Sequence, residues 1–143
     1  MGKWMLSLMV AAIAAGGYCN DWPVWRGPDR NGISKETGWN PKNAKKLWTK
    51  ELGDGYSSVS VKGGRLYTMG LKSGDEKTDT VYCLDAKTGN EIWSYSYSCQ
   101  PGPYKGPRAT PVCDADSVYT LSRDGQLICF DAGSGKVKWK TDV

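Results

Sequence analysis

Short apolar runs, separated by Gly, Asp, Asn and Ser, follow one another from about residue 57 to residue 143. Several runs are apolar at every position, as in Leu-Ile-Cys-Phe at 127–130. Successive side chains of a strand point to opposite faces, so these runs predict strands that are covered on both sides. Turn residues divide the runs into two groups of four. The predicted strands are 57–61, 65–69, 80–84, 91–95, 110–113, 117–121, 126–130 and 137–141.

Three tryptophans recur 45 and 46 residues apart, namely Trp48, Trp93 and Trp139. Upstream of the last two, the segments 81–89 and 127–135 share Cys, Asp-Ala and Gly at one constant offset. A repeat of this length with about four short strands per unit is the signature of propeller blades. The sequence therefore predicts an all-β fold, a β-propeller, with blades near 53–97 and 106–143. We expect the three indoles to dock between blades.

The segment 47–52 looks like the outermost strand of a further blade, whose other strands do not precede it. Closed propellers have about 4 to 8 blades, whereas this sequence holds about two. Residues 47–143 are therefore expected to be a partial propeller, a fragment of one with about seven or eight blades. Missing blades would complete the ring. Without them the outward blade faces would be apolar and open, which favours self-association.

Each repeat contains a turn that opens with Asp and closes with Gly, from Asp85 to Gly89 and from Asp131 to Gly135. A calcium loop needs several oxygen ligands at alternate positions, and each of these turns has one Asp. An Asp that opens a turn accepts backbone N–H bonds, while Gly tolerates the left-handed conformation. The two turns are therefore interpreted as structural hairpins, with no metal.

The first 17 residues combine one cation, Lys3, with an apolar run that ends in small residues. This is the pattern of a cleavable signal peptide, and the run is shorter than the roughly 20 apolar residues of a membrane span. We therefore expect an exported protein, periplasmic or extracellular. Lipid attachment at Cys19 is the less favoured alternative, because Ala15 and Tyr18 fit a lipid-attachment box poorly. Residues 18–46 predict an irregular arm, held down by three tryptophans: Trp22, Trp25 and Trp39.

Five cysteines in an exported chain permit disulfides. Cys83 and Cys129 occupy equivalent places in adjacent blades, whose sheets lie about 10 Å apart, whereas a disulfide needs Cα atoms within about 7 Å. We expect these two to be small core residues. The pairing of Cys99 with Cys113 is the bridge to test.

Loops that lead into innermost strands face the axis of a propeller. Tyr56 and Ser57 lie on one such loop and Arg108 on the next, so these three are the candidate ligand-binding residues. The segment 53–58 begins like a dinucleotide fingerprint, but it lacks the third Gly and precedes a strand. The chain has no His, which excludes histidine bases and histidine ligands, and the scattered carboxylates form no assignable catalytic pair.

The net charge of +4 does not require an acidic partner. The one basic cluster lies next to the predicted strand 47–52, where lysines typically protect a strand edge. Its members are Lys42, Lys45, Lys46 and Lys50. Nucleic-acid binding is therefore not expected.

The segments Val-Tyr-Cys-Leu-Asp-Ala-Lys-Thr-Gly-Asn-Glu-Ile-Trp at 81–93 and Leu-Ile-Cys-Phe-Asp-Ala-Gly-Ser-Gly-Lys-Val-Lys-Trp at 127–139 resemble pyrroloquinoline quinone (PQQ) type repeats. The resemblance covers residues 47–143. Asp-Trp-Pro-Val-Trp-Arg-Gly-Pro-Asp-Arg-Asn-Gly at 21–32 is similar to the opening of exported bacterial PQQ-like propellers, a group near the outer-membrane β-barrel assembly lipoprotein.

This family contains both quinoprotein dehydrogenases and scaffold propellers that bind no quinone. For a dehydrogenase the resemblance implies a calcium site, a catalytic Asp and often a pair of adjacent cysteines, and none of these can be matched in this sequence. We therefore predict a non-catalytic binding scaffold in the cell envelope with a protein partner. The alternative is part of a PQQ-dependent dehydrogenase that oxidises alcohols or sugars, in which missing blades would supply the cofactor site.

Overall fold

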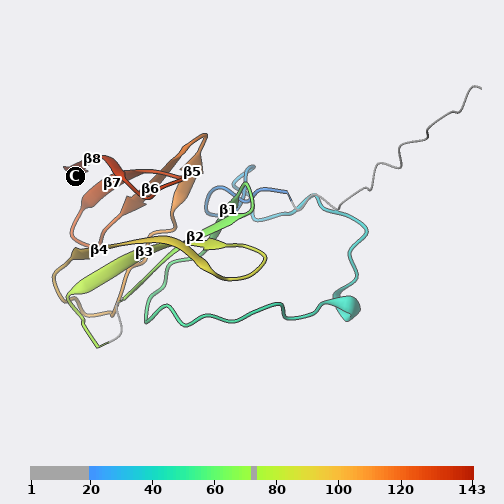
Figure 1. The fold of residues 1–143 in the computed structure, drawn as a ribbon, viewed down its shortest axis with the longest axis horizontal. Helices are drawn as coiled ribbons and strands as arrows, with labels where there is room; N and C mark the ends of the chain where they lie inside the picture. Colours follow the sequence, from blue (N-terminus) through green and yellow to red (C-terminus); the bar gives the residue numbers. More distant parts are fainter. Residues whose placement is uncertain (1–19, 72–73) are drawn as a thin grey trace, which may run out of the picture.

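Two four-stranded antiparallel sheets form the body of the protein in the computed structural model, which describes residues 20–71 and 74–143 (Figure 1). The predicted all-β fold is confirmed, and every predicted strand of the two sheets is present. The first sheet contains β1 (Ser60–Lys62), β2 (Arg65–Leu71), β3 (Thr78–Asp85) and β4 (Glu91–Ser98). The second contains β5 (Val112–Asp114), β6 (Ser117–Leu121), β7 (Gln126–Asp131) and β8 (Val137–Asp142).

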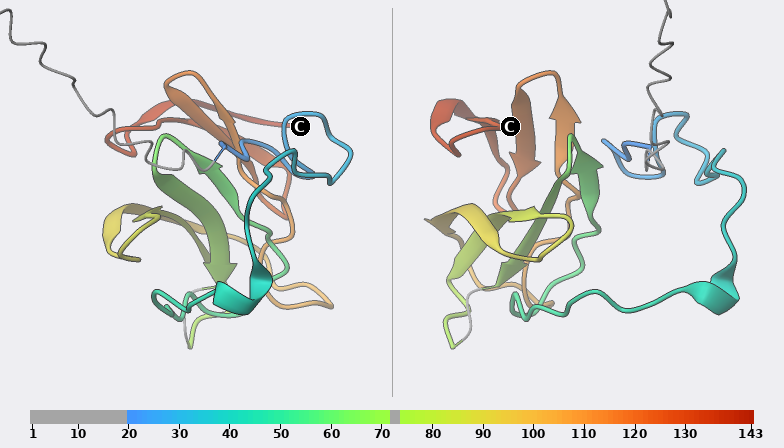
Figure 2. Two further views of the ribbon diagram at one scale, coloured as in Figure 1. Left: turned by 90° about the vertical axis from the view of Figure 1, so that its right-hand side faces the viewer. Right: turned by 45° about the vertical axis from the view of Figure 1, so that its right-hand side comes forward.

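Each sheet is a simple meander, in the orders β1-β2-β3-β4 and β5-β6-β7-β8. The first strands of the two sheets contact each other, and the sheets stand beside one another as neighbouring blades (Figure 2). Because the strands alternate in direction, the connections alternate between the two ends of the strands, and these ends form two opposite faces of the molecule. We call the face with the segments 53–59, 99–111 and 122–125 the loop face. The turn face carries the turns at 63–64, 86–90, 115–116 and 132–136.

The core lies between the two sheets and is aromatic. The ring of Trp93 on β4 lies 5.7 Å from that of Phe130 on β7 and 6.0 Å from that of Tyr67 on β2. Tyr95 meets Phe130 edge to face at 5.1 Å. Aliphatic side chains complete this core and are inaccessible to solvent: Val81, Val118 and Ile128. The apolar runs of the sequence are therefore explained by cover on both sides of the central strands.

The predicted outer strand at 47–52 is wrong, because those residues form no strand. An outer strand needs the third strand of its own blade as a hydrogen-bonding partner, and none of the described strands occupies that place. The segment runs instead across the outward face of the first sheet, where Leu52 lies against Gly70 and Trp48 against Gly89. That face is thus covered, contrary to the expectation that both outward faces are open.

The irregular arm contacts the innermost strand of both sheets. Trp22 exchanges two backbone hydrogen bonds with Val61 on β1, at 2.7 and 2.9 Å. The carbonyl of Pro23 accepts the N–H of Cys113 on β5 at 2.8 Å. The rest of the arm extends away from the sheets and contains one 3-10 turn, η1 (Pro41–Asn43) (Figure 2). Trp22 holds the arm down as expected, whereas two tryptophans do not, with exposed fractions of 64% and 71%: Trp25 and Trp39.

The candidate bridge between Cys99 and Cys113 is not formed. Both thiols are free and buried, as are those of Cys83 and Cys129. Cys99 instead accepts a hydrogen bond from Arg123 at 2.7 Å. Burial is the main cause that raises the pKa of Cys83 to about 11 and that of Cys113 to about 12. These thiols are therefore protonated at neutral pH.

The outward face of the second sheet is open. Trp139 on β8 is 45% exposed, and its ring lies 6.0 Å from that of Tyr119 on the same sheet. Further apolar side chains of the second sheet are at least 37% exposed: Val112, Leu121 and Val137. Within the described residues, no helix has the length and apolar character needed to cross a membrane.

Candidate functional site

The Asp-to-Gly turns lie on the turn face and have the geometry of capped hairpins. In the first, Asp85 Oδ1 accepts the backbone N–H of Lys87 at 3.0 Å and of Thr88 at 2.8 Å. Gly89 closes the turn at φ +72°. The second turn repeats this, with Asp131 Oδ1 accepting from Ser134 N at 2.8 Å and Ser134 Oγ at 2.7 Å. The carboxylate oxygen of each turn is thus satisfied within its own turn.

Each turn also receives a tryptophan from the preceding part of the chain. The indole N–H of Trp48 donates to the carbonyl of Ala86 at 3.1 Å, and that of Trp93 donates to the carbonyl of Ala132 at 3.0 Å. Trp139 is the third member of the series, and among the described residues no such turn follows it. The indoles of Trp48 and Trp93 thus pack against the turns and fix their position.

A second group of side chains lies on the loop face and is exposed. Tyr56 and Tyr104 are 64% and 58% exposed, and their rings meet edge to face with centroids 6.4 Å apart. The Arg108 guanidinium lies over the Tyr104 ring, 4.8 Å from its centroid. These three residues, which we call the tyrosine cleft, line a shallow cleft of about 300 Å³. Two of the three predicted residues are therefore brought together.

Ser57 does not line this cleft, and its hydroxyl donates to the neighbouring carbonyl of Ser58 at 3.0 Å. Tyr104 is a cleft residue that sequence reasoning missed. Its signal was present, since it stands four residues before Arg108 in the same loop into an innermost strand. Residues 106–111 correspond to the approach to the first blade, whereas Tyr104 lies before them and has no equivalent position there.

The backbone holds the two cleft loops together. The N–H of Tyr56 donates to the carbonyl of Pro107 at 2.8 Å. Gly106 has φ +78° and packs directly on the backbone of Asp54, leaving no room for a Cβ. The cleft side chains are therefore displayed by a fixed crossing of two loops from adjacent blades.

A buried ion pair lies below the loop face and joins the two sheets. Asp79 on β3 is fully buried, and its carboxylate accepts from Arg123 Nε and Nη2, both at 3.2 Å. Arg123 also donates to the carbonyl of Glu76 at 2.9 Å. Neighbouring Tyr97 has a buried hydroxyl with no partner, and burial is the main cause that raises its pKa. The Asp79–Arg123 pair thus links the two sheets.

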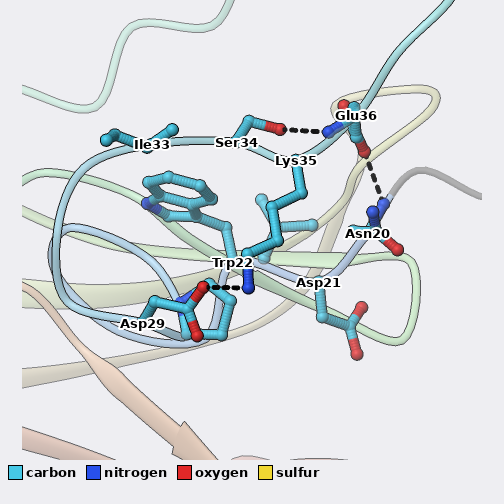
Figure 3. A pocket seen from close by; sticks show the side chains of 10 residues that line it. Asn20, Asp21, Trp22, Asp29, Ile33, Ser34, Lys35 and Glu36 are labelled. Carbon is cyan, nitrogen blue, oxygen red and sulfur yellow. Dashed lines mark hydrogen bonds and ion pairs between the residues drawn. The ribbon is translucent and has the colours of Figure 1, made fainter.

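The arm forms a further pocket on the turn-face side, of about 340 Å³ (Figure 3). Trp22, Ile33 and Val61 supply its apolar lining. Two polar contacts close its rim: Lys35 pairs with Asp29 at 2.6 Å, and Glu36 accepts the backbone N–H of Asn20 at 2.6 Å. The Asp29 carboxylate raises the pKa of the Lys35 ammonium. Lys35, Asp29 and Glu36 are therefore engaged within the arm itself.

The exposed side chains at these places are suited to ligand recognition. Among residues 20–71 and 74–143, no three His, Cys, Asp or Glu side chains are grouped so that they could hold a metal ion. The tyrosine cleft offers two hydroxyls, two aromatic rings and one guanidinium. Such groups bind apolar rings, carbonyl oxygens and carboxylates.

One protein-family model, described as outer membrane protein assembly factor BamB, matches residues 37–143. The chain belongs to this family of PQQ-like repeats. The match covers both sheets and the segment that crosses the first one. It confirms the PQQ-like repeats that the sequence predicts.

Two relatives from Pseudomonas putida are quinone enzymes. A quinoprotein ethanol dehydrogenase is 28% identical over 117 residues, which cover 70% of this chain and 17% of that protein. Quinohemoprotein alcohol dehydrogenase ADH IIB is 37% identical over 68 residues, which cover 41% of this chain and 9% of that protein. The chain thus spans less than a fifth of the length of either relative.

Solved propellers share the fold. A europium-containing methanol dehydrogenase matches 85% of this chain and 23% of its own, with a TM-score of 0.65 and 22% identity. Quinohemoprotein alcohol dehydrogenase from Comamonas testosteroni matches 85% of this chain and 19% of its own, with a TM-score of 0.61 and 23% identity. BamB from Moraxella catarrhalis matches 68% of this chain and 27% of its own, with a TM-score of 0.51 and 20% identity.

Proposed function

We propose that this chain is part of an exported, non-catalytic PQQ-like propeller that binds a protein partner in the cell envelope. The observation that carries the proposal is the tyrosine cleft, where Tyr56, Tyr104 and Arg108 stand exposed on a fixed crossing of two loops. Tyrosine and arginine are enriched among the residues that dominate protein interfaces. The family match to an outer membrane assembly factor supports a scaffold role.

Export is part of the same proposal. It is supported by the signal-peptide pattern of the first 17 residues, which lie outside the described residues. Lipid attachment at Cys19 remains the less favoured alternative, and that residue also lies outside the described part of the chain. The mass of the protein recovered from the envelope of its own cells tests both, because cleavage removes a peptide and lipidation adds acyl chains.

The experiment that tests the partner uses the tagged full-length protein, cross-linked in the envelope of its own cells and then purified. We expect Tyr104→Ala to lose a cross-linked partner that the unchanged protein retains. Trp25→Ala is the matched control, because Trp25 is as exposed as Tyr56, at 64%, and lies in the arm. Equal capture by all three proteins would contradict the proposal.

The second candidate function is part of a PQQ-dependent alcohol dehydrogenase, and the two quinone enzymes among the relatives favour it. The described residues do not fit the calcium site that this function implies, because they contain no group of three His, Cys, Asp or Glu side chains that could hold a metal ion. Any such site would require blades beyond those described. Addition of PQQ and calcium to the full-length protein, followed by dye-linked ethanol oxidation, distinguishes this candidate from a scaffold.

A further inference from the structure

We propose that the tyrosine cleft binds an extended, proline-rich peptide segment that carries a carboxylate next to its proline ring. This inference rests on the proposed function and specifies the chemistry of the partner. The site is the cleft of about 300 Å³ lined by Tyr56, Tyr104 and Arg108 on the loop face.

The geometry of the rings favours a peptide. Tyr56 and Tyr104 have an interplanar angle of 89° and centroids 6.4 Å apart, so the two perpendicular rings form an aromatic corner. A sugar ring stacks best on a flat aromatic platform, but Arg108 already covers one face of Tyr104 at 4.8 Å. A proline ring is compact and apolar, and it can pack into the corner that the two perpendicular rings make. Aromatic-lined grooves are the usual docking sites of proline-rich segments.

The polar groups of the cleft match the rest of such a segment. A polyproline helix makes no internal hydrogen bonds, so its carbonyl oxygens are available to the tyrosine hydroxyls. Arg108 takes part in no ion pair among the described residues, whereas neighbouring Lys105 is paired with Glu76 at 2.6 Å. Asp54 lies beside the cleft and disfavours a second carboxylate there. One carboxylate, placed opposite Arg108, therefore complements the site.

The backbone of the two loops that carry the cleft is held in place. Its two loops are joined by the Tyr56 to Pro107 backbone bond and by the close packing of Gly106 on Asp54. A polyproline segment is itself extended before binding. Neither the cleft loops nor the peptide therefore loses much backbone conformational entropy on binding, which favours binding through a small contact area.

The test measures fluorescence anisotropy of a labelled Gly-Pro-Pro-Glu-Pro-Pro-Gly peptide with the full-length protein. A second peptide with Gln in place of Glu probes the role of the carboxylate. A third peptide with Ser in place of each Pro probes the role of the proline rings. We expect Tyr56→Ala and Tyr104→Ala each to weaken binding about tenfold or more. Arg108→Gln should weaken binding of the Glu peptide and leave binding of the Gln peptide unchanged. Trp25→Ala should bind like the unchanged protein.

The inference is overturned if the Ser peptide binds as well as the Pro peptide, or if the tyrosine substitutions have no effect. It is also overturned if a chitin oligosaccharide, but not the Pro peptide, binds in a Tyr104-dependent manner. Failure of the peptide while Tyr104 is still needed to capture an envelope protein would reject this inference alone. Loss of both would reject the proposed function as well. The substituted side chains are exposed, and circular dichroism checks that each variant is folded.

Discussion

Trp93 and Gly135 are in direct contact, and the contact requires that residue 135 have no side chain. A Cβ built on Gly135 would lie 2.6 Å from Cδ2 of Trp93, and the backbone there has φ +71°. The same relationship holds between Trp48 and Gly89, again at 2.6 Å and with φ +72°. One sequence feature, Asp to Gly followed by Trp, therefore supplies the contact surface of each blade and the side chain that reaches the next.

Gly135→Ala should be strongly destabilising. The left-handed backbone alone costs about 1 kcal/mol for a residue with a Cβ, and displacement of the Trp93 ring adds the larger cost of about 1–3 kcal/mol that overpacking brings. Urea unfolding followed by circular dichroism measures the change in the free energy of unfolding. The control is Gly64→Ala, because Gly64 has φ +75° and no atom within 4 Å of its Cβ position. Equal losses for the two variants would show that ring contact contributes nothing.

The buried ion pair should show strong coupling between the sheets. Asp79 is fully buried and the Arg123 side chain is 10% exposed, so removal of one partner leaves an uncompensated charge. We expect Asp79→Asn and Arg123→Met each to cost about 3–5 kcal/mol. The double variant should cost clearly less than the two single losses together, because neither charge then remains. Additive losses in this double-mutant cycle would contradict direct coupling.

Acidification should weaken the Asp-to-Gly turns. Hydrogen bonds from Thr88, first from its backbone N–H, lower the pKa of Asp85, and those of Ser134, first from its hydroxyl, lower the pKa of Asp131. A lowered pKa in the folded state means that stability is complete above the ordinary Asp value of about 4. It is lost as the pH falls through the lowered values.

Unfolding free energies measured between about pH 5 and pH 2 should therefore fall less steeply for Asp85→Asn with Asp131→Asn than for the unchanged chain. Asparagine keeps an oxygen that can accept the turn bonds but does not titrate. Asp116→Asn is a useful comparison, because Asp116 has its pKa lowered chiefly by Lys138 outside these turns. An unaltered slope in the double variant would show that the turn carboxylates do not contribute.

Local patterns predicted most of the fold. The apolar runs and Asp-to-Gly turns indicated the eight strands, because each signal depends on residues close together in the chain. The segment 47–52 was predicted incorrectly for the opposite reason. Its strand-like pattern around Trp48 is real, but a strand also requires a partner strand, and the described chain places it across a sheet face instead.

The candidate site could be predicted only in part. Tyr56 and Arg108 were indicated by their equivalent positions before innermost strands, whereas Tyr104 depends on the path of one interblade loop. The partners of Cys99 could not be predicted, because Arg123 reaches it from a turn of the other sheet. Contacts between distant segments depend on packing that no local pattern contains.

The exposed face of the second sheet leads to a final prediction, that the 143-residue chain expressed alone self-associates through Trp139. Trp139 is oriented against Tyr119 as Trp93 is against Tyr67, with interplanar angles of 51° and 48° and the same 6.0 Å separation. Trp93 is 8% exposed because the second sheet covers it, whereas Trp139 is 45% exposed. Burial of one such indole contributes roughly 3 kcal/mol or less, so several apolar neighbours must act together.

Sedimentation velocity over a range of concentrations measures this association. We expect Trp139→Ser to shift the chain toward monomer, and Trp139→Ser with Leu121→Ser to shift it further, because both side chains lie on the open face. Trp25→Ser removes an equally large exposed side chain from the arm and should leave the sedimentation unchanged. If all these chains sediment alike, the open face is not the site of association. If only the face variants become monomeric, Trp139 is buried between two chains, just as Trp93 is buried between the two sheets of one chain.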